Sequence, residues 1–391
     1  MASSAVSAAP TSPANDLGTL PVWDLTDLYP GLDSAELKRD LAGVADQAAK
    51  LERQWKGKVA NAGGEQLAGM IAEYEALQDL IGRMYSYASL AYAGDMADPK
   101  VAGFYQDMQE KLNDIGTKLL FLTLELNRIE DADLEKKYAE SAKLAHYRPW
   151  LRDLRLFRDH QLDDELERLL HEKAVAGRAA WNRLFDETMA GLRFPYGKEQ
   201  LTAEQVLHKL SDKDAKTRKL AAKTLAKVFK QNIRLFALIT NTLIKDKEVE
   251  DRWRKYPTPE AYRHLSNCVE PEVVNALTDA VTAAYPKLSH RYYKLKAKWM
   301  GAKKLNWWDR NAPLPEDNDR MIGWDEARDT VLKAYGRFSP QLADLGKKFF
   351  DNAWIDAPAR PGKASGAFAH PTVPSAHPYL LLNYQGRTRD V

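Results

Sequence analysis

Apolar residues recur at steps of three and four positions through much of the chain, a spacing that places them on one face of a helix. One such segment runs from Ser34 to Trp55, and a second, after a break at Gly63-Gly64, runs from Leu67 to about Ala93. A third begins at Asp98-Pro99, where the aspartate can cap a helix and the proline suits its first turn. Three long amphipathic helices with short connections predict an antiparallel bundle.

Shorter helical segments follow between Asp131 and Gly191, with breaks expected near Pro149, near His160 and at Gly177. The run Phe194-Pro195-Tyr196-Gly197 is typical of a turn and predicts a domain boundary at about residues 197–204. Residues 19–200 are therefore expected to form a helical N-terminal region, separate from residues 201–391.

The second half of the chain also has the pattern of helices. Thr202 with Gln205 predicts a capping box, and Ser211 with Asp214 predicts the start of another helix. Further helices are expected over residues 233–249, 270–284, 287–300, 323–335 and 339–352. Lysines alternate with apolar residues between Lys213 and Lys230, and we interpret them as the solvated face of a helix rather than a nucleic-acid-binding stripe.

One segment breaks the helical pattern. Tyr379 to Tyr384 is a short apolar run between Pro378 and Gly386, which predicts a buried strand. A single strand cannot satisfy its own backbone N–H and C=O groups, so another segment must pair with it. The expected fold class is mainly α, with a helical bundle and a small β element near the C-terminus.

Composition limits the classes of partner. The 391 residues are 45% hydrophobic and 29% charged, as in ordinary globular proteins, and the net charge of +2 favours neither nucleic acid nor a membrane surface. No apolar run is long enough to span a membrane, and residues 1–18 lack the pattern of a signal peptide. We predict a flexible N-terminal arm over residues 1–18 and a cytoplasmic protein. Cys268, the single cysteine, is expected to be buried and structural.

Several motifs, in one order along the chain, carry a resemblance to a known family. They are DRWRKYPTPEAYRHLSN, RYYKLKAKWMG, WWDRNAPLP, WIDAPARPGKASGAFAHP and HPYLLLNYQG. Together they resemble oligoendopeptidase F, a relative of thimet oligopeptidase. Trp308 stands where that family usually has a tyrosine. The resemblance implies that residues 201–391 are the N-terminal part of a helical zincin-type catalytic domain.

The family's zinc motif, His-Glu-x-x-His, does not occur in this sequence. Its one His-Glu pair, His171-Glu172, has Val175 where the second histidine would be needed. By resemblance, the motif is expected beyond Val391, so we expect a truncated, incomplete domain that neither binds stoichiometric zinc nor cleaves peptides alone. Zinc is expected in the complete enzyme. Truncation would also leave apolar surface exposed among residues 204–391.

The resemblance implies that the complete enzyme hydrolyses short, unfolded oligopeptides. We expect the strand Tyr379 to Tyr384 to be the edge at which a peptide docks through main-chain hydrogen bonds, with the glycines from Gly362 to Gly366 allowing close backbone approach. The expected substrate-binding residues are His370, His377, Tyr379, Leu381, Asn383 and Tyr384, and no catalytic or metal-ligating residue is expected in the chain. The alternatives are a strand simply buried in its sheet and, for the whole chain, a non-catalytic helical protein that binds peptides or partners.

Overall fold

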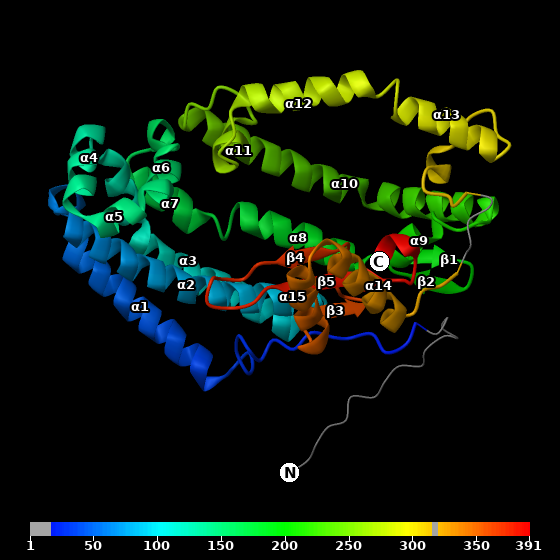
Figure 1. The fold of residues 1–391 in the computed structure, drawn as a ribbon, viewed down its shortest axis with the longest axis horizontal. Helices are drawn as coiled ribbons and strands as arrows, with labels where there is room; N and C mark the ends of the chain where they lie inside the picture. Colours follow the sequence, from blue (N-terminus) through cyan, green and yellow to red (C-terminus); the bar gives the residue numbers. More distant parts are fainter. Residues whose placement is uncertain (1–16, 315–319) are drawn as a thin grey trace, which may run out of the picture.

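Helices dominate the fold (Figure 1), which a computed structural model describes over residues 17–314 and 320–391. The predicted class, mainly α with a small β element near the C-terminus, is confirmed. Residues 1–16 of the predicted N-terminal arm lie outside the described residues. The Leu17 carbonyl accepts a 2.8 Å hydrogen bond from the Trp324 amide, so the part of the predicted arm that is described is attached to the start of α14. Within the described ranges, no helix combines the length and apolar character that a membrane span requires.

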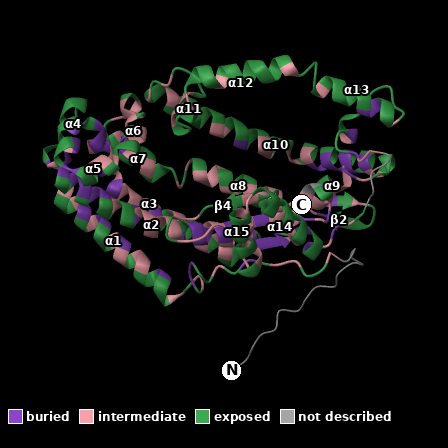
Figure 2. Cartoon of the chain, in the orientation of Figure 1, coloured by how far each residue is buried: buried purple, intermediate pink, exposed green. Residues whose placement is uncertain are grey.

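The first three helices form the predicted bundle, and all three pairs of helices pack against each other. They are α1 (Ala35–Trp55), α2 (Gly64–Gly94) and α3 (Pro99–Arg128). Ser34 and Asp98 cap α1 and α3 by accepting hydrogen bonds from backbone amides two or three residues later. The apolar stripes of these helices supply most of the main core (Figure 2).

Five shorter helices follow, broken near His160 and at Gly177 as predicted. They are α4 (Asp131–Glu140), α5 (Ala142–His146), α6 (Arg148–Arg155), α7 (Asp164–Lys173) and α8 (Arg178–Gly191). Short 3-10 turns occur at Val59–Asn61 and Arg158–His160. Pro149 lies inside the first turn of α6, where a missing N–H has no cost, so the break precedes it.

The turn predicted at Gly197 is confirmed, and it joins two strands that the sequence did not reveal. Strands β1 (Phe194–Tyr196) and β2 (Glu199–Leu201) form an antiparallel hairpin, and Gly197 has φ +63°. The capping box of Thr202 and Gln205 then opens α9 (Ala203–Lys209), as predicted.

Helix α10 (Ala215–Trp253) corrects two predictions. Asp214, not Ser211, is its N-cap and accepts a 2.8 Å hydrogen bond from the Thr217 amide. The helix predicted to begin at Ile233 is the second half of α10, because no glycine or proline interrupts the 39 residues. Its lysines are solvent-exposed as expected, but Arg218 is buried and paired with Asp309.

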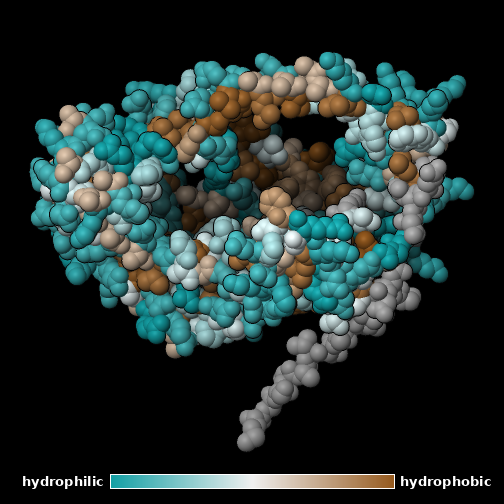
Figure 3. All heavy atoms as spheres, in the orientation of Figure 1, coloured by the Kyte–Doolittle hydropathy of each residue, from teal (hydrophilic) through white to brown (hydrophobic). Residues whose placement is uncertain are grey.

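An arm of helices continues from α10 (Figure 1), and Figure 3 shows a hollow between this arm and the body of the molecule. It contains α11 (Ala261–Ser266), α12 (Pro271–Ala284), α13 (Ser289–Trp299) and the 3-10 turn Trp307–Asp309. Figure 3 shows hydrophobic atoms along α12 beside the hollow. Helices α14 (Trp324–Phe338) and α15 (Pro340–Asp351) then pack together and lead back to the body of the molecule.

The strand predicted at Tyr379–Tyr384 is confirmed as β5, but it is the central strand of a sheet and not an edge. It pairs in parallel with β3 (Ile355–Pro358) and antiparallel with β4 (Phe368–His370), in the order β3-β5-β4. Its two partners are too short to show a periodic pattern, which is why the prediction of an exposed docking edge at β5 is wrong. The last turn is a 3-10 helix at Thr388–Asp390.

The sheet is built onto the bundle through shared core residues. Tyr379 and Leu381 of β5 belong to the same buried cluster as the bundle helices and the N-terminal residues Trp23 and Tyr29. The Tyr379 hydroxyl donates to the Asp24 carbonyl at 3.1 Å. The bundle, the N-terminal segment and the sheet therefore pack together into one body, and β4 lies at the edge of its sheet. We call this body the platform.

Candidate peptide-binding site

Three of the six predicted substrate-binding residues are buried in the platform. Tyr379 and Leu381 are completely inaccessible to solvent, and Tyr384 is 3% exposed. The Tyr384 hydroxyl donates to the Ile322 carbonyl at 2.8 Å. Tyr379 and Leu381 alternate on the face that packs on the bundle, and Tyr384 packs on the other face against Ile322 and Trp324, so these side chains offer no surface to a peptide.

The two predicted histidines hold the loop between β4 and β5, His370 against α2 and His377 against the N-terminal segment. His370 Nε2 lies 2.9 Å from Ser86 Oγ, and burial lowers the pKa of this imidazole. His377 stacks on Trp354, with ring centroids 3.8 Å apart, and its Nε2 lies 2.9 Å from the Asp27 carboxylate. Both imidazoles thus hydrogen-bond to protein groups and shape the loop.

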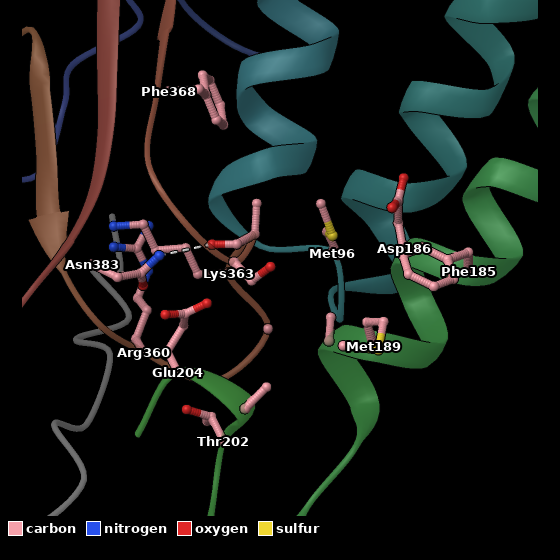
Figure 4. Close-up of a pocket in the computed structure, with 15 residues that line it drawn as sticks. Met96, Phe185, Asp186, Met189, Thr202, Glu204, Arg360, Lys363, Phe368 and Asn383 are labelled. Carbon is pink, nitrogen blue, oxygen red and sulfur yellow. Dashed lines mark hydrogen bonds between the residues drawn. The ribbon is translucent and has the colours of Figure 1, made fainter. Parts of the chain in front are cut away.

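Of the six predicted residues, Asn383 lines the cavity beside β4. Its Nδ2 donates to the carbonyls of Ala364 and Gly366, at 3.0 and 2.8 Å. The cavity holds about 290 Å³ and lies between the loop before β4, the strand itself and helices α8 and α9 (Figure 4). Asn383 therefore holds the loop that forms one wall of the cavity.

A buried ionic cluster, which the sequence did not suggest, also holds this loop in place. The Asp356 carboxylate, fully buried on β3, accepts bonds from Lys363 Nζ at 2.7 Å and from both terminal nitrogens of Arg360 at 2.6 Å. Lys363 Nζ also donates to the carbonyls of Asp356, Pro358 and Leu382. Burial lowers the pKa of Lys363, although the nearby carboxylate opposes the shift. In the sequence, the only signal of this cluster was Asp356, an acidic residue directly after the apolar Trp354-Ile355 pair.

Two glycines give the loop its shape, as predicted. Gly362 and Gly366 have φ values of +83° and +78°, which glycine adopts without steric cost. A Cβ on Gly362 would lie 2.4 Å from Asp95 Oδ1, so a side chain does not fit there. The Gly366 amide donates to Glu204 Oε1 at 3.0 Å, which joins the loop to α9.

The open edge of the sheet is β4. The Leu380 amide donates to the Trp354 carbonyl at 2.9 Å, so the backbone groups of Leu380 face the β3 side. Ala369 is the register partner of Leu380 on β4, and its N–H and C=O therefore point away from β5. No described residue hydrogen-bonds to these two groups, and the Ala369 side chain is exposed. Such an edge can accept another extended chain.

Cys268 lies elsewhere and corrects a prediction. It is exposed, not buried, and it follows α11 in a left-handed conformation with φ +49°. In this position after a helix end, its side chain faces solvent. Among residues 17–314 and 320–391, no three His, Cys, Asp or Glu side chains are grouped as a metal site requires.

Comparisons with known proteins confirm the resemblance to oligoendopeptidase F. The family model described as Oligopeptidase F matches residues 125–194. Oligopeptidase PepF of Bacillus subtilis is 24% identical over 379 residues, covering 94% of this chain and 55% of the relative. An oligoendopeptidase F homolog of Lactococcus lactis is also 24% identical, covering 96% and 63%. The chain thus spans only 55% and 63% of the lengths of these two relatives.

Solved structures share the fold. Oligoendopeptidase-F from Enterococcus faecium has a TM-score of 0.67 at 21% identity, covering 82% of this chain and 60% of that one. PZ peptidase A with inhibitor 2 has a TM-score of 0.73 at 16% identity, covering 94% and 62%.

Proposed function

We propose that this chain forms the peptide-binding wall of an oligoendopeptidase F-like zinc metallopeptidase, which hydrolyses short, unfolded peptides. The observation that carries the proposal is the unpaired outer edge of β4 beside a cavity, in a chain whose relatives are named as oligopeptidases. A peptide that pairs with β4 gains main-chain hydrogen bonds that do not depend on its side chains. This suits an enzyme that accepts many sequences.

We assign to β4 the role first expected of β5, which is to pair with the backbone of the peptide. The buried members of β5 support the edge from behind, and Asn383 and Lys363 fix the loop that leads into it. Both histidines hold the loop that leaves β4. The substrate contacts themselves come from the backbone of β4.

Zinc, which the resemblance implies for the complete enzyme, does not fit any set of residues described in this chain. Structural and catalytic zinc sites need at least three protein ligands around one ion. We therefore assign peptide binding, and no step of hydrolysis, to the residues described in this chain.

A methylation scan of the peptide tests the docking edge without altering the protein. A series of N-acetylated peptides, each N-methylated at a different backbone position, is titrated against the chain by calorimetry. Methyl groups at alternate positions should weaken binding about tenfold, because each one removes a donor and crowds the edge. Equal effects at all positions would contradict strand pairing.

Ala369→Pro provides the matching change on the protein. It removes the outward N–H of β4 but leaves the pairing with β5, since proline is tolerated on edge strands. Peptide affinity should fall several-fold, whereas the control Ala369→Gly, which keeps the N–H, should bind as the unmodified chain does. Circular dichroism checks that both variants remain folded.

A further inference from the structure

Apolar side chains form much of the lining of the cavity beside β4. Helix α8 supplies Phe185, Asp186 and Met189, and Figure 4 shows these side chains on one side with Met96 next to them. Phe368 of β4 lines the same cavity. Thioether and aromatic groups thus form a largely apolar passage that starts at the strand edge. Such a passage accommodates a methylene chain.

The charged groups of the lining are satisfied by the protein with one exception. Arg360 and Lys363 are both bonded to Asp356, and Glu204 accepts a bond from the Gly366 amide. The Asp186 carboxylate has no hydrogen bond or ion pair with any described residue, although it is half-buried. Burial raises the pKa of Asp186, and the nearby Glu187 acts in the same direction. A half-buried carboxylate without a counter-ion gains stability from a cation.

We propose that this cavity is a specificity pocket for a basic side chain of the peptide, with Asp186 binding the cationic end of lysine or arginine. The proposal rests on the function proposed above, because the peptide must lie along β4 for its side chain to enter beside Phe368. A volume of about 290 Å³ accommodates one large side chain and not a folded segment. The apolar walls favour a side chain with a methylene stem over the α-ammonium group of a peptide, which has no such stem.

Binding of matched peptides tests the pocket. N-acetylated, C-amidated peptides differ at one position, which carries lysine, arginine, norleucine or glutamate, and the position is moved through the peptide one residue at a time. In one register, the lysine and arginine peptides should bind about tenfold tighter than the norleucine peptide, as expected for a charged hydrogen bond in a half-buried site. The glutamate peptide should bind most weakly. Acetylation removes the terminal amine as a competing cation.

Asp186→Asn should bring the lysine and norleucine peptides to within about twofold of each other, because the amide has a similar shape but no charge. Asp186→Glu should keep part of the preference, and the control Glu187→Gln, which leaves the Asp186 carboxylate in place, should keep most of it. Equal affinities for lysine and norleucine peptides in every register, or a preference that survives in Asp186→Asn, would overturn the pocket. The methylation pattern of the norleucine peptide shows separately whether docking on β4 holds. Failure of every peptide to bind would overturn both proposals.

Discussion

Lys363 shows how a single buried residue maintains the binding edge. Its side chain is fully shielded from solvent, and its ammonium group donates to one carboxylate oxygen and three carbonyls. These acceptors lie on β3, at Asp356 and Pro358, and on β5, at Leu382. Desolvating an ammonium group is costly unless every donor is used, as it is here. Lys363 therefore connects β3 to β5, the strand that pairs with β4.

We predict that Lys363→Met destabilises the chain by about 3 kcal/mol, because it leaves Asp356 with one cationic partner and leaves buried carbonyls without donors. Urea unfolding followed by circular dichroism measures the change. The matched control is Lys347→Met, which removes an exposed ion pair with Asp351 and should change stability little. Equal effects of the two substitutions would show that the cluster does not stabilise the fold.

The glycines of α2 provide a second test at residue scale. A Cβ on Gly82 would lie 2.6 Å from Val373 Cγ1 in the loop between β4 and β5, whereas a Cβ on Gly69 would meet nothing within 4 Å. Gly69→Ala should stabilise the chain by about 0.5–1 kcal/mol through helix propensity. Gly82→Ala should instead destabilise it by about 1–2 kcal/mol, because the loop must shift.

Thermal unfolding of both glycine variants gives these differences. Val373→Ala in the Gly82→Ala background removes the clashing methyl group and should recover most of the loss. If Gly82→Ala is as stabilising as Gly69→Ala, the loop does not press on α2.

At the scale of elements, the sequence predicted well those features that depend only on residues close together in the chain. The caps at Asp98 and Thr202 and the stripes of α1 to α3 need only nearby residues, and the structure has them as predicted. The order of the sheet depends on contacts between segments far apart in sequence. For the candidate site, sequence reasoning located the loop and Asn383 but missed Ala369, Asp186 and the Asp356 cluster, because none of these has a periodic or motif signal.

The pair of Glu167 and Arg254 joins α7 to the end of α10 and predicts a pH dependence. Two hydrogen bonds of 2.6 and 2.9 Å connect the side chains, which are largely buried. Burial alone would raise the pKa of Glu167, but the bonds from Arg254 and from the Leu162 amide outweigh it, so the pKa is lowered from 4.5. The stabilisation is therefore fully present above pH 4.5 and is lost as the pH falls through the lowered pKa.

Glu167→Gln should reduce stability by about 2 kcal/mol at pH 7 and flatten the loss of stability on acidification. Chemical unfolding at several pH values between neutral and strongly acidic measures both effects. The control, Glu172→Gln, breaks an exposed pair with Arg168 and should leave the pH profile of the chain unchanged. A Glu167→Gln profile parallel to that of the unmodified chain would contradict the lowered pKa.

At the scale of the whole molecule, the body and the arm differ in how they bury apolar residues. The bundle and sheet enclose theirs in a large shared core and in a second cluster between the sheet and α14, whereas α10 and α12 leave many exposed (Figures 2 and 3). On α12, Val273, Leu277 and Val281 recur every four residues and are 55%, 65% and 43% exposed. This spacing makes one apolar stripe along the helix. Stripes of this kind are normally covered in folded proteins or serve as contact surfaces.

We predict that the chain binds dyes specific for apolar surfaces, such as anilinonaphthalene sulfonate, while it is folded. Replacing the three stripe residues of α12 together by serine should remove much of the dye fluorescence, because it interrupts the largest exposed stripe on that helix. The change should leave the unfolding transition of the bundle in place, since these side chains contribute nothing to the buried core. Leu345→Ser, at a residue that is 56% exposed on α15, is the control and should keep most of the fluorescence. Weak dye binding by the unmodified chain would mean that these faces are covered in solution, and light scattering would then show whether a second copy covers them.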